Sequence, residues 1–227
     1  MNSLKTCLIC IVTTFSCTTV LADDWLRSVP EFELTDHLGN THTLKDYEQY
    51  DLAVFYVQGV GCPIARIALP NYREVRDEYV SENIAFTMFN SNIQDNLARI
   101  AKEADEFGID FPIMKDEGQK LAKALGVERT AEAFVFNPKT KEVLFRGPIN
   151  DQLGYETQRN SASNWYLKDA LNTILAGKQI NMDDVPDSKG CLVAILIIDQ
   201  THLCSSCQNT FLPIVAIEIS LRRLVDN

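Results

Sequence analysis

The chain has 227 residues, of which 46% are hydrophobic and 23% charged, so it has the composition of a globular protein and wholesale disorder is excluded. Its 21 Lys and Arg residues against 31 Asp and Glu residues give a formal net charge of −10 at pH 7. Such an acidic chain repels phosphate backbones, and no Lys/Arg cluster interrupts the pattern. We therefore expect no nucleic-acid partner.

The first 22 residues have the pattern of an export signal. Lys5 is the only charge before Asp23, and an apolar run over 7–15 precedes small residues that end at Ala22. The run is short of the roughly 20 apolar residues that cross a bilayer. We expect a signal peptide over 1–22, cleaved after Ala22, and a periplasmic or secreted protein without a transmembrane segment after cleavage. Lipid attachment at Cys17 is the alternative.

Hydrophobic periodicity predicts alternating strands and helices in the next part of the chain. In chain order we expect a hairpin (32–34 and 41–44), a buried strand (51–58), a helix from Pro63 to Tyr79, a strand (84–89), a helix (97–107), an extended piece (111–114), a short helix (119–125), two strands (133–136 and 142–146) and a helix (164–175).

The alternation predicts parallel strands joined by right-handed crossovers, and the closing strand pair adds antiparallel strands to the same sheet. We expect an α/β fold: a mixed sheet flanked by helices on both faces, in one domain over 23–182. Residues 183–227 form a polar linker and a poorly patterned tail.

Four cysteines remain after removal of the signal. In an oxidising compartment each must be paired, metal-bound, redox-active or sequestered; they are Cys62, Cys191, Cys204 and Cys207.

Cys62 lies where the central predicted strand ends and the first long helix begins. Unpaired N–H groups and the helix dipole stabilise a thiolate at such a position, and Pro63 suits the first helical turn. Arg66, one turn further on, adds positive charge. We therefore expect a lowered pKa and a reactive thiol at Cys62. The alternative is a buried, inert cysteine.

The turn around Cys62 resembles the active-site turn of thioredoxin-fold redoxins, in particular the exported branch of the alkyl hydroperoxide reductase/thiol-specific antioxidant (AhpC/TSA) superfamily. Element order agrees over about residues 28–193, and the resemblance implies a thioredoxin-like fold. The matching motifs are Gly61-Cys62-Pro63-Ile64-Ala65, Asn90-Ser91-Asn92 with Asp95, Phe111-Pro112-Ile113 with Lys115-Asp116, Glu128-Arg129-Thr130, Gly147-Pro148-Ile149-Asn150-Asp151-Gln152 and Gly190-Cys191-Leu192-Val193.

Three positions depart from the family pattern. Ala65 stands where a C-x-x-C site has its second cysteine, so no disulfide can form within the motif. Phe55 and Gly59 replace the Pro and the Thr or Ser that precede a peroxiredoxin nucleophile. Thr130-Ala131 replaces Thr followed by a cis-proline, and because a non-proline cis bond costs about 3 kcal/mol we expect a trans peptide.

Cys62 then needs another partner. A sulfenic acid at Cys62 would be resolved by Cys191, Cys204, Cys207 or an external thiol, whereas a mixed disulfide needs an external reductant. Arg129 and Thr130 precede the loop that the resemblance places opposite Cys62, and we expect Arg129 to support its thiolate.

The tail pair Cys204 and Cys207 has C-x-x-C spacing. Relatives in this family often continue into a c-type haem domain marked C-x-x-C-H, but Gln208 replaces the haem-ligating histidine. We expect no cofactor and no metal. A short disulfide, an incidental pair and a truncated remnant of a longer protein remain open.

These observations favour a thiol-based oxidoreductase of the cell envelope. It would use Cys62 as its single nucleophilic thiolate towards peroxide or protein disulfide substrates, with an external thiol as reductant. The alternative is a non-catalytic thioredoxin-fold module that binds a partner protein, or a remnant of a redoxin–cytochrome c fusion.

Overall fold

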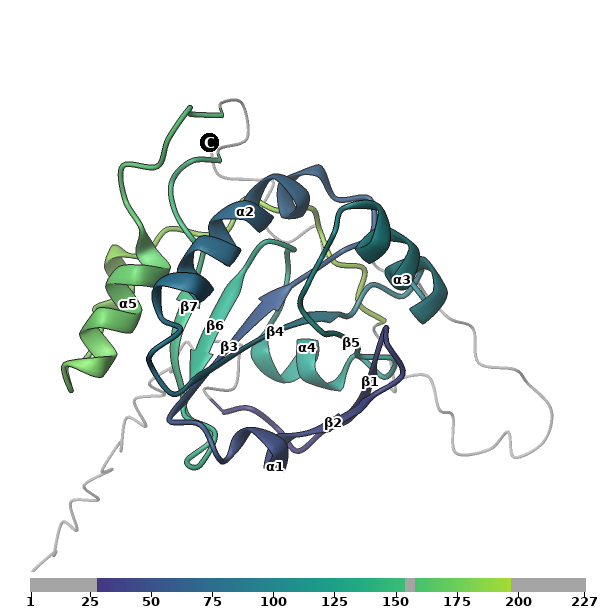
Figure 1. Ribbon diagram of the computed structural model, residues 1–227, viewed down its shortest axis with the longest axis horizontal. Helices are drawn as coiled ribbons and strands as arrows, with labels where there is room; N and C mark the ends of the chain where they lie inside the picture. The colour runs from purple at the N-terminus through teal and green to yellow at the C-terminus, as the bar shows by residue number, and fades with distance from the viewer. Residues whose placement is uncertain (1–27, 154–157, 197–227) are drawn as a thin grey trace, which may run out of the picture.

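The computed structural model describes residues 28–153 and 158–196, in which seven strands form one sheet (Figure 1). The elements are β1 (Glu33–Asp36), β2 (Thr41–Thr43), α1 (Leu44–Tyr47), β3 (Leu52–Val57), α2 (Pro63–Glu78), β4 (Ile84–Asn90), α3 (Leu97–Glu106), β5 (Ile113–Lys115), α4 (Lys120–Leu125), β6 (Ala133–Phe136), β7 (Val143–Gly147), α5 (Tyr166–Leu175) and a 3-10 turn, η1 (Met182–Asp184).

The strand order is β2-β1-β5-β4-β3-β6-β7. Strands β3, β4 and β5 run parallel to one another, whereas β6 and β7 join the β3 edge in antiparallel fashion. The predicted mixed α/β sheet is therefore confirmed. The N-terminal hairpin extends the same sheet, because β1 pairs with β5, a pairing that the sequence pattern did not indicate.

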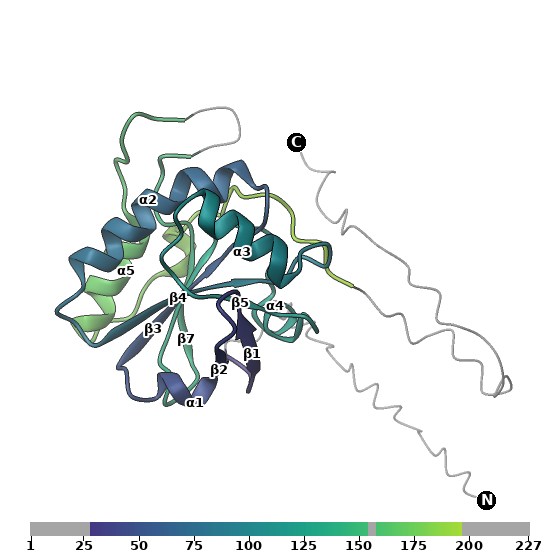
Figure 2. The same ribbon diagram turned by 45° about the vertical axis from the view of Figure 1, so that its right-hand side comes forward.

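Helices cover both faces of the sheet, which explains why the β3 sequence is apolar throughout. Val54 and Tyr56 belong to a core that includes residues of α2, α3 and α5. Ala53, Phe55 and Val57 belong to a second core with α1 and α4. Figures 1 and 2 show the helices arranged around the sheet in this way. As a result the carboxyl end of β3, where the chain enters α2, lies within the protein.

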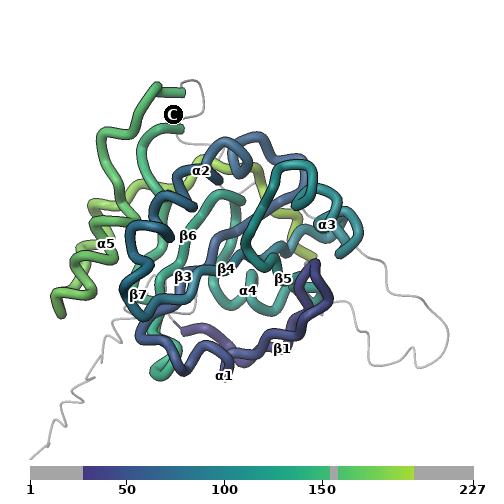
Figure 3. Tube along the Cα trace, viewed as in Figure 1, coloured from purple at the N-terminus to yellow at the C-terminus, as the bar shows by residue number. Residues whose placement is uncertain are grey.

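Residues 188–196 run back along the domain after η1. This stretch is yellow-green in the tube of Figure 3 and passes near α3. Arg129 and Leu192 form an antiparallel bridge, the N–H of Val193 donates to the Glu128 carbonyl at 2.9 Å, and the Val193 side chain is buried. Although we assigned 183–227 to a linker and tail, this stretch packs against the sheet domain up to residue 196.

Two predicted features lie outside the described residues: the signal peptide over 1–22 and the Cys204/Cys207 pair. Within 28–153 and 158–196, no helix combines the length and the apolar character needed to cross a membrane. The domain boundaries at 22/23 and 182/183 remain predictions.

Candidate active site

Cys62 is the N-cap residue of α2, directly after the loop that leaves β3. Its N–H donates to the Gly59 carbonyl at 3.1 Å, closing a tight turn in which Gly61 has a φ of +81° that favours glycine. Pro63 occupies the first helical position, as the sequence predicted. The Cys62 side chain is only 4% exposed, so the turn presents its sulfur to the interior of the site.

Two side chains from distant parts of the chain contact this sulfur. The Thr130 Oγ1 lies 3.0 Å from the Cys62 Sγ, and Thr130 is fully buried in the loop before β6. The Cys191 Sγ lies 2.7 Å from the Cys62 Sγ, although the two residues are 129 positions apart. Both residues are therefore neighbours of the predicted nucleophile.

These contacts change the acidity of the two thiols in opposite directions. Burial alone raises the pKa of Cys62, but hydrogen bonds with the Cys191 thiol, the Thr130 hydroxyl and the backbone of Ala65 and Cys191 outweigh it and leave that pKa below its ordinary value. Burial and the neighbouring Cys62 sulfur raise the pKa of Cys191 to about 11. Of the two thiols, Cys62 is therefore the one that loses its proton at the lower pH.

Thr130 also holds the Cys191 backbone in place. The Thr130 N–H donates to the Cys191 carbonyl, and the Cys191 N–H donates to the Thr130 Oγ1, both at 2.9 Å. Every peptide bond in the described ranges is trans, which confirms the expected trans bond between Thr130 and Ala131. Ala131 has a φ of +61°, and its N–H donates to the Val57 carbonyl at 2.8 Å.

Two buried carboxylates hold the loop in front of Cys62. The Glu103 Oε2 accepts from the Gly61 N–H at 2.8 Å and from the Arg66 guanidinium at 2.6 Å. The Asp95 Oδ2 accepts from the Val60 N–H at 3.0 Å. Because both carboxylates are almost completely buried, these hydrogen bonds are shielded from water and fix the position of the turn.

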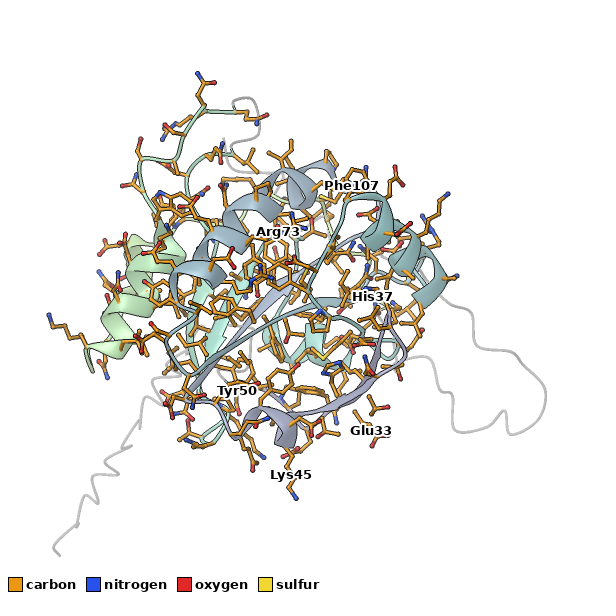
Figure 4. The ribbon with its side chains drawn as sticks, in the orientation of Figure 1. Glu33, His37, Lys45, Tyr50, Arg73 and Phe107 are labelled. Carbon is orange, nitrogen blue, oxygen red and sulfur yellow. The ribbon has the colours of Figure 1, made fainter. Side chains whose placement is uncertain are left out.

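The two arginines predicted to support the thiolate each form a hydrogen bond with a group other than the Cys62 sulfur. Arg66 pairs with Glu103, and its guanidinium lies 4.1 Å from the centre of the Phe107 ring, at the end of α3 (Phe107 is labelled in Figure 4). Arg129 donates to the Gly190 carbonyl at 3.1 Å, which helps to hold the Cys191 segment. Direct support of the Cys62 thiolate by either arginine remains a prediction.

Glu103 was not among the residues that the sequence singled out. A signal was present, because Glu103 lies on the same helical face as Ile100 and Ala104, where a solvated carboxylate is not expected. Asp95 appeared only as part of a family motif. In the described residues no group of three or more His, Cys, Asp or Glu side chains is arranged to hold a metal ion.

Comparison with known proteins agrees with this fold. Residues 26–143 match the AhpC/TSA family. The thiol-disulfide oxidoreductase ResA of Geobacillus thermodenitrificans (strain NG80-2) is 25% identical over 119 residues, which cover 52% of this chain and 67% of that protein.

Two solved structures are similar in fold. A hypothetical protein from Sinorhizobium meliloti 1021 has a TM-score of 0.61 and 24% identity, with coverage of 74% of this chain and 93% of its own. A putative thioredoxin from Neisseria meningitidis has a TM-score of 0.51 and 16% identity, with coverage of 66% and 91%. The matched family segment spans about half of the chain, and the sheet is thioredoxin-like. The chain belongs to the AhpC/TSA family.

Proposed function

We propose that this protein is a thiol–disulfide oxidoreductase whose reactive group is the Cys62 thiolate. The observation that carries the proposal is the contact of the Cys62 Sγ with the Thr130 hydroxyl and the Cys191 thiol at the start of α2. These contacts lower the pKa of Cys62, and the thiolate is the form that attacks a disulfide. The similarity to ResA supports the same reaction class.

The chemistry begins when the Cys62 thiolate attacks one sulfur of a substrate disulfide. The other substrate sulfur leaves as a thiolate and takes up a proton, and Cys62 is left in a mixed disulfide. A second thiol must then attack this mixed disulfide, so that the substrate is released in its reduced form. Ala65, whose side chain is buried one turn into α2, has no sulfur to do so.

Replacing Cys62 by serine tests this function. We expect Cys62→Ser to reduce the rate of insulin disulfide reduction, with dithiothreitol as reductant, to the uncatalysed rate. Cys207→Ser is the matched control and should retain the activity. Unchanged activity of Cys62→Ser would show that Cys62 is not the reactive group.

Peroxide reduction is the second candidate, because a side chain only 4% exposed is more accessible to a small oxidant than to a protein disulfide. In that case the thiolate is oxidised to a sulfenic acid while the peroxide is reduced to an alcohol or water. Hydrogen peroxide consumption coupled to an external thiol tests it. If the native protein consumes hydrogen peroxide no faster than Cys62→Ser does, the peroxidase assignment is rejected.

A non-catalytic binding module remains the competing class, because Ala65 and Ala131 replace family residues. The pH dependence of alkylation separates the two classes. The rate at which iodoacetamide modifies a reactive Cys62 rises with pH, with a midpoint below the ordinary thiol pKa, whereas an inert cysteine shows no such midpoint.

We also propose export through residues 1–22, and the N-terminal residue of the mature protein tests that proposal.

A further inference from the structure

The sulfur of Cys62 has one cysteine neighbour in the described residues, and that neighbour belongs to a segment held in a fixed position. A disulfide bond is about 2.0 Å long, so the 2.7 Å between the two Sγ atoms needs to shorten by only roughly 0.7 Å. The backbone of Cys191 is fixed by two hydrogen bonds with Thr130. The pair is therefore placed for bond formation without rearrangement of the sheet.

The segment that carries Cys191 passes very close to the backbone of Thr130, and this close approach depends on Gly190. A Cβ atom at this position would lie 1.8 Å from the Thr130 carbonyl oxygen, so only glycine allows this approach. On the other side of Cys191, Val193 bonds to Glu128, and the N–H of Ala194 donates to the Asn92 Oδ1 at 3.3 Å. Contacts on both sides thus hold Cys191 against the active-site turn.

The two sulfurs differ in their accessibility to a partner. Cys62 is buried, whereas Cys191 is exposed. An incoming thiolate attacks the sulfur that it can reach, and the exchange is faster when the leaving thiol is the more acidic of the two. Both preferences point in the same direction, towards attack at Cys191 with Cys62 as the leaving group.

We propose that Cys62 and Cys191 form the exchangeable disulfide of this protein, and that an external thiol reduces it by attacking Cys191. This inference rests on the proposed function and gives the reactive thiolate its resolving partner. The redox site is then assembled from the start of α2 and the segment after α5, instead of from two cysteines in one helical turn.

The steps balance in electrons and protons. After the Cys62 thiolate forms a mixed disulfide with the substrate, the Cys191 thiol loses its proton and its sulfur attacks the Cys62 sulfur. The substrate leaves as a thiolate and takes up a proton, and the Cys62–Cys191 bond forms. An external thiolate then attacks the Cys191 sulfur, and Cys62 leaves as a thiolate. A second external thiolate attacks the external sulfur of the new mixed disulfide, Cys191 regains its proton, and the reductant leaves as a disulfide.

Disulfide mapping on the full chain tests the pairing. Trypsin releases Cys62 in a peptide that ends at Arg66, but leaves Cys191, Cys204 and Cys207 together after Lys189; a second cleavage before Asp199 separates Cys191 from the tail pair. After oxidation by diamide and alkylation of residual thiols, we expect the peptide of Cys62 to be joined to the peptide of residues 190–198. A Cys62 bond to the tail peptide, or an alkylated Cys62, overturns the pairing.

Mapping of the first mixed disulfide tests the site of entry. The variant carries Cys204→Ser and Cys207→Ser; circular dichroism checks that it is folded, and diamide oxidises Cys62 and Cys191. Brief treatment with glutathione, acid quenching and alkylation of the released thiol then mark the two cysteines. We expect glutathione on Cys191 and the alkyl group on Cys62, in at least about tenfold excess over the reverse arrangement. Glutathione on Cys62 in equal or larger amount overturns entry at Cys191.

The two proposals fail in different ways. If Cys62→Ser retains activity while the Cys62–Cys191 bond still forms in the native protein, the proposed function fails and the pairing stands. If Cys62→Ser is inactive and Cys191→Ser turns over at the native rate, the function stands and Cys191 is not its resolving partner.

Discussion

Glu103 accepts a hydrogen bond of 2.8 Å from the N–H of Gly61, the residue that directly precedes Cys62. The carboxylate lies on α3, which is far from the active-site turn in the sequence, and Arg66 of α2 balances its charge at 2.6 Å. A single buried side chain therefore connects α3, α2 and the turn that positions the thiolate.

We predict that Glu103→Gln destabilises the protein by about 1–3 kcal/mol, because the amide loses the charge-assisted bonds to Gly61 and Arg66 in a buried setting. Urea unfolding measures the change. Glu106→Gln on the same helix is the matched control, since Glu106 is exposed, and should change the free energy of unfolding by no more than about 0.5 kcal/mol. Equal effects of the two substitutions would contradict the role of Glu103.

Thr130→Val should raise the pKa of Cys62, because it removes the hydroxyl that lies 3.0 Å from the sulfur and helps to stabilise the thiolate. Since only the thiolate is alkylated, the rate of iodoacetamide modification rises with pH through this pKa. In the native protein we expect the pH dependence of Cys62 modification to have its midpoint below the ordinary thiol pKa. In Thr130→Val we expect this midpoint to move to higher pH.

Thr87→Val is the control for the loss of a buried hydroxyl. Thr87 is also buried, but its hydroxyl bonds to Tyr47 on the other side of the sheet. This variant should leave the midpoint of Cys62 unchanged. A midpoint that stays in place in Thr130→Val would show that Thr130 does not act on the thiolate.

Gly190→Ala should separate the two cysteines, because the added methyl group overlaps the Thr130 carbonyl and pushes the 190–196 segment away. We expect the rate of Cys62–Cys191 disulfide formation under diamide to fall by about tenfold or more. Gly118→Ala is the matched control, since a Cβ there meets no atom within 4 Å and its φ is compatible with alanine. Equal rates in the two variants would contradict the crossing at Gly190.

The predicted disulfide should also stabilise the domain. Joining residues 129 positions apart removes conformational entropy from the unfolded chain, and the expected gain is about 2–5 kcal/mol. Guanidinium unfolding of the oxidised and the reduced protein measures it. Cys191→Ser should show no difference between oxidising and reducing conditions, and a persisting difference would assign the stabilisation to other cysteines.

Much of the fold could be predicted from the sequence because its signals are local. The apolar run of β3, the helical period after Pro63 and the turn residues between β6 and β7 each determine an element from its own residues. The pairing of β1 with β5 could not be predicted in this way, since strand partners depend on contacts between distant segments.

The same distinction between local signals and contacts of distant segments applies to the active site. Cys62 was recognisable from its place between a strand and a helix, and Thr130 from its motif. Cys191 was one of three equivalent resolving candidates, because cysteine spacing alone cannot tell which sulfur approaches Cys62. Its position depends on the backbone crossing at Thr130, which exists only once the sheet is assembled.

The wide separation of Cys62 and Cys191 along the chain has a topological consequence. A bond between their sulfurs would close a covalent ring that contains every element from α2 to η1. A protease that cuts the backbone once inside this ring would leave the pieces joined. Nicked oxidised protein would migrate as one species on a denaturing gel, and would fall apart into two fragments only after a reducing agent is added.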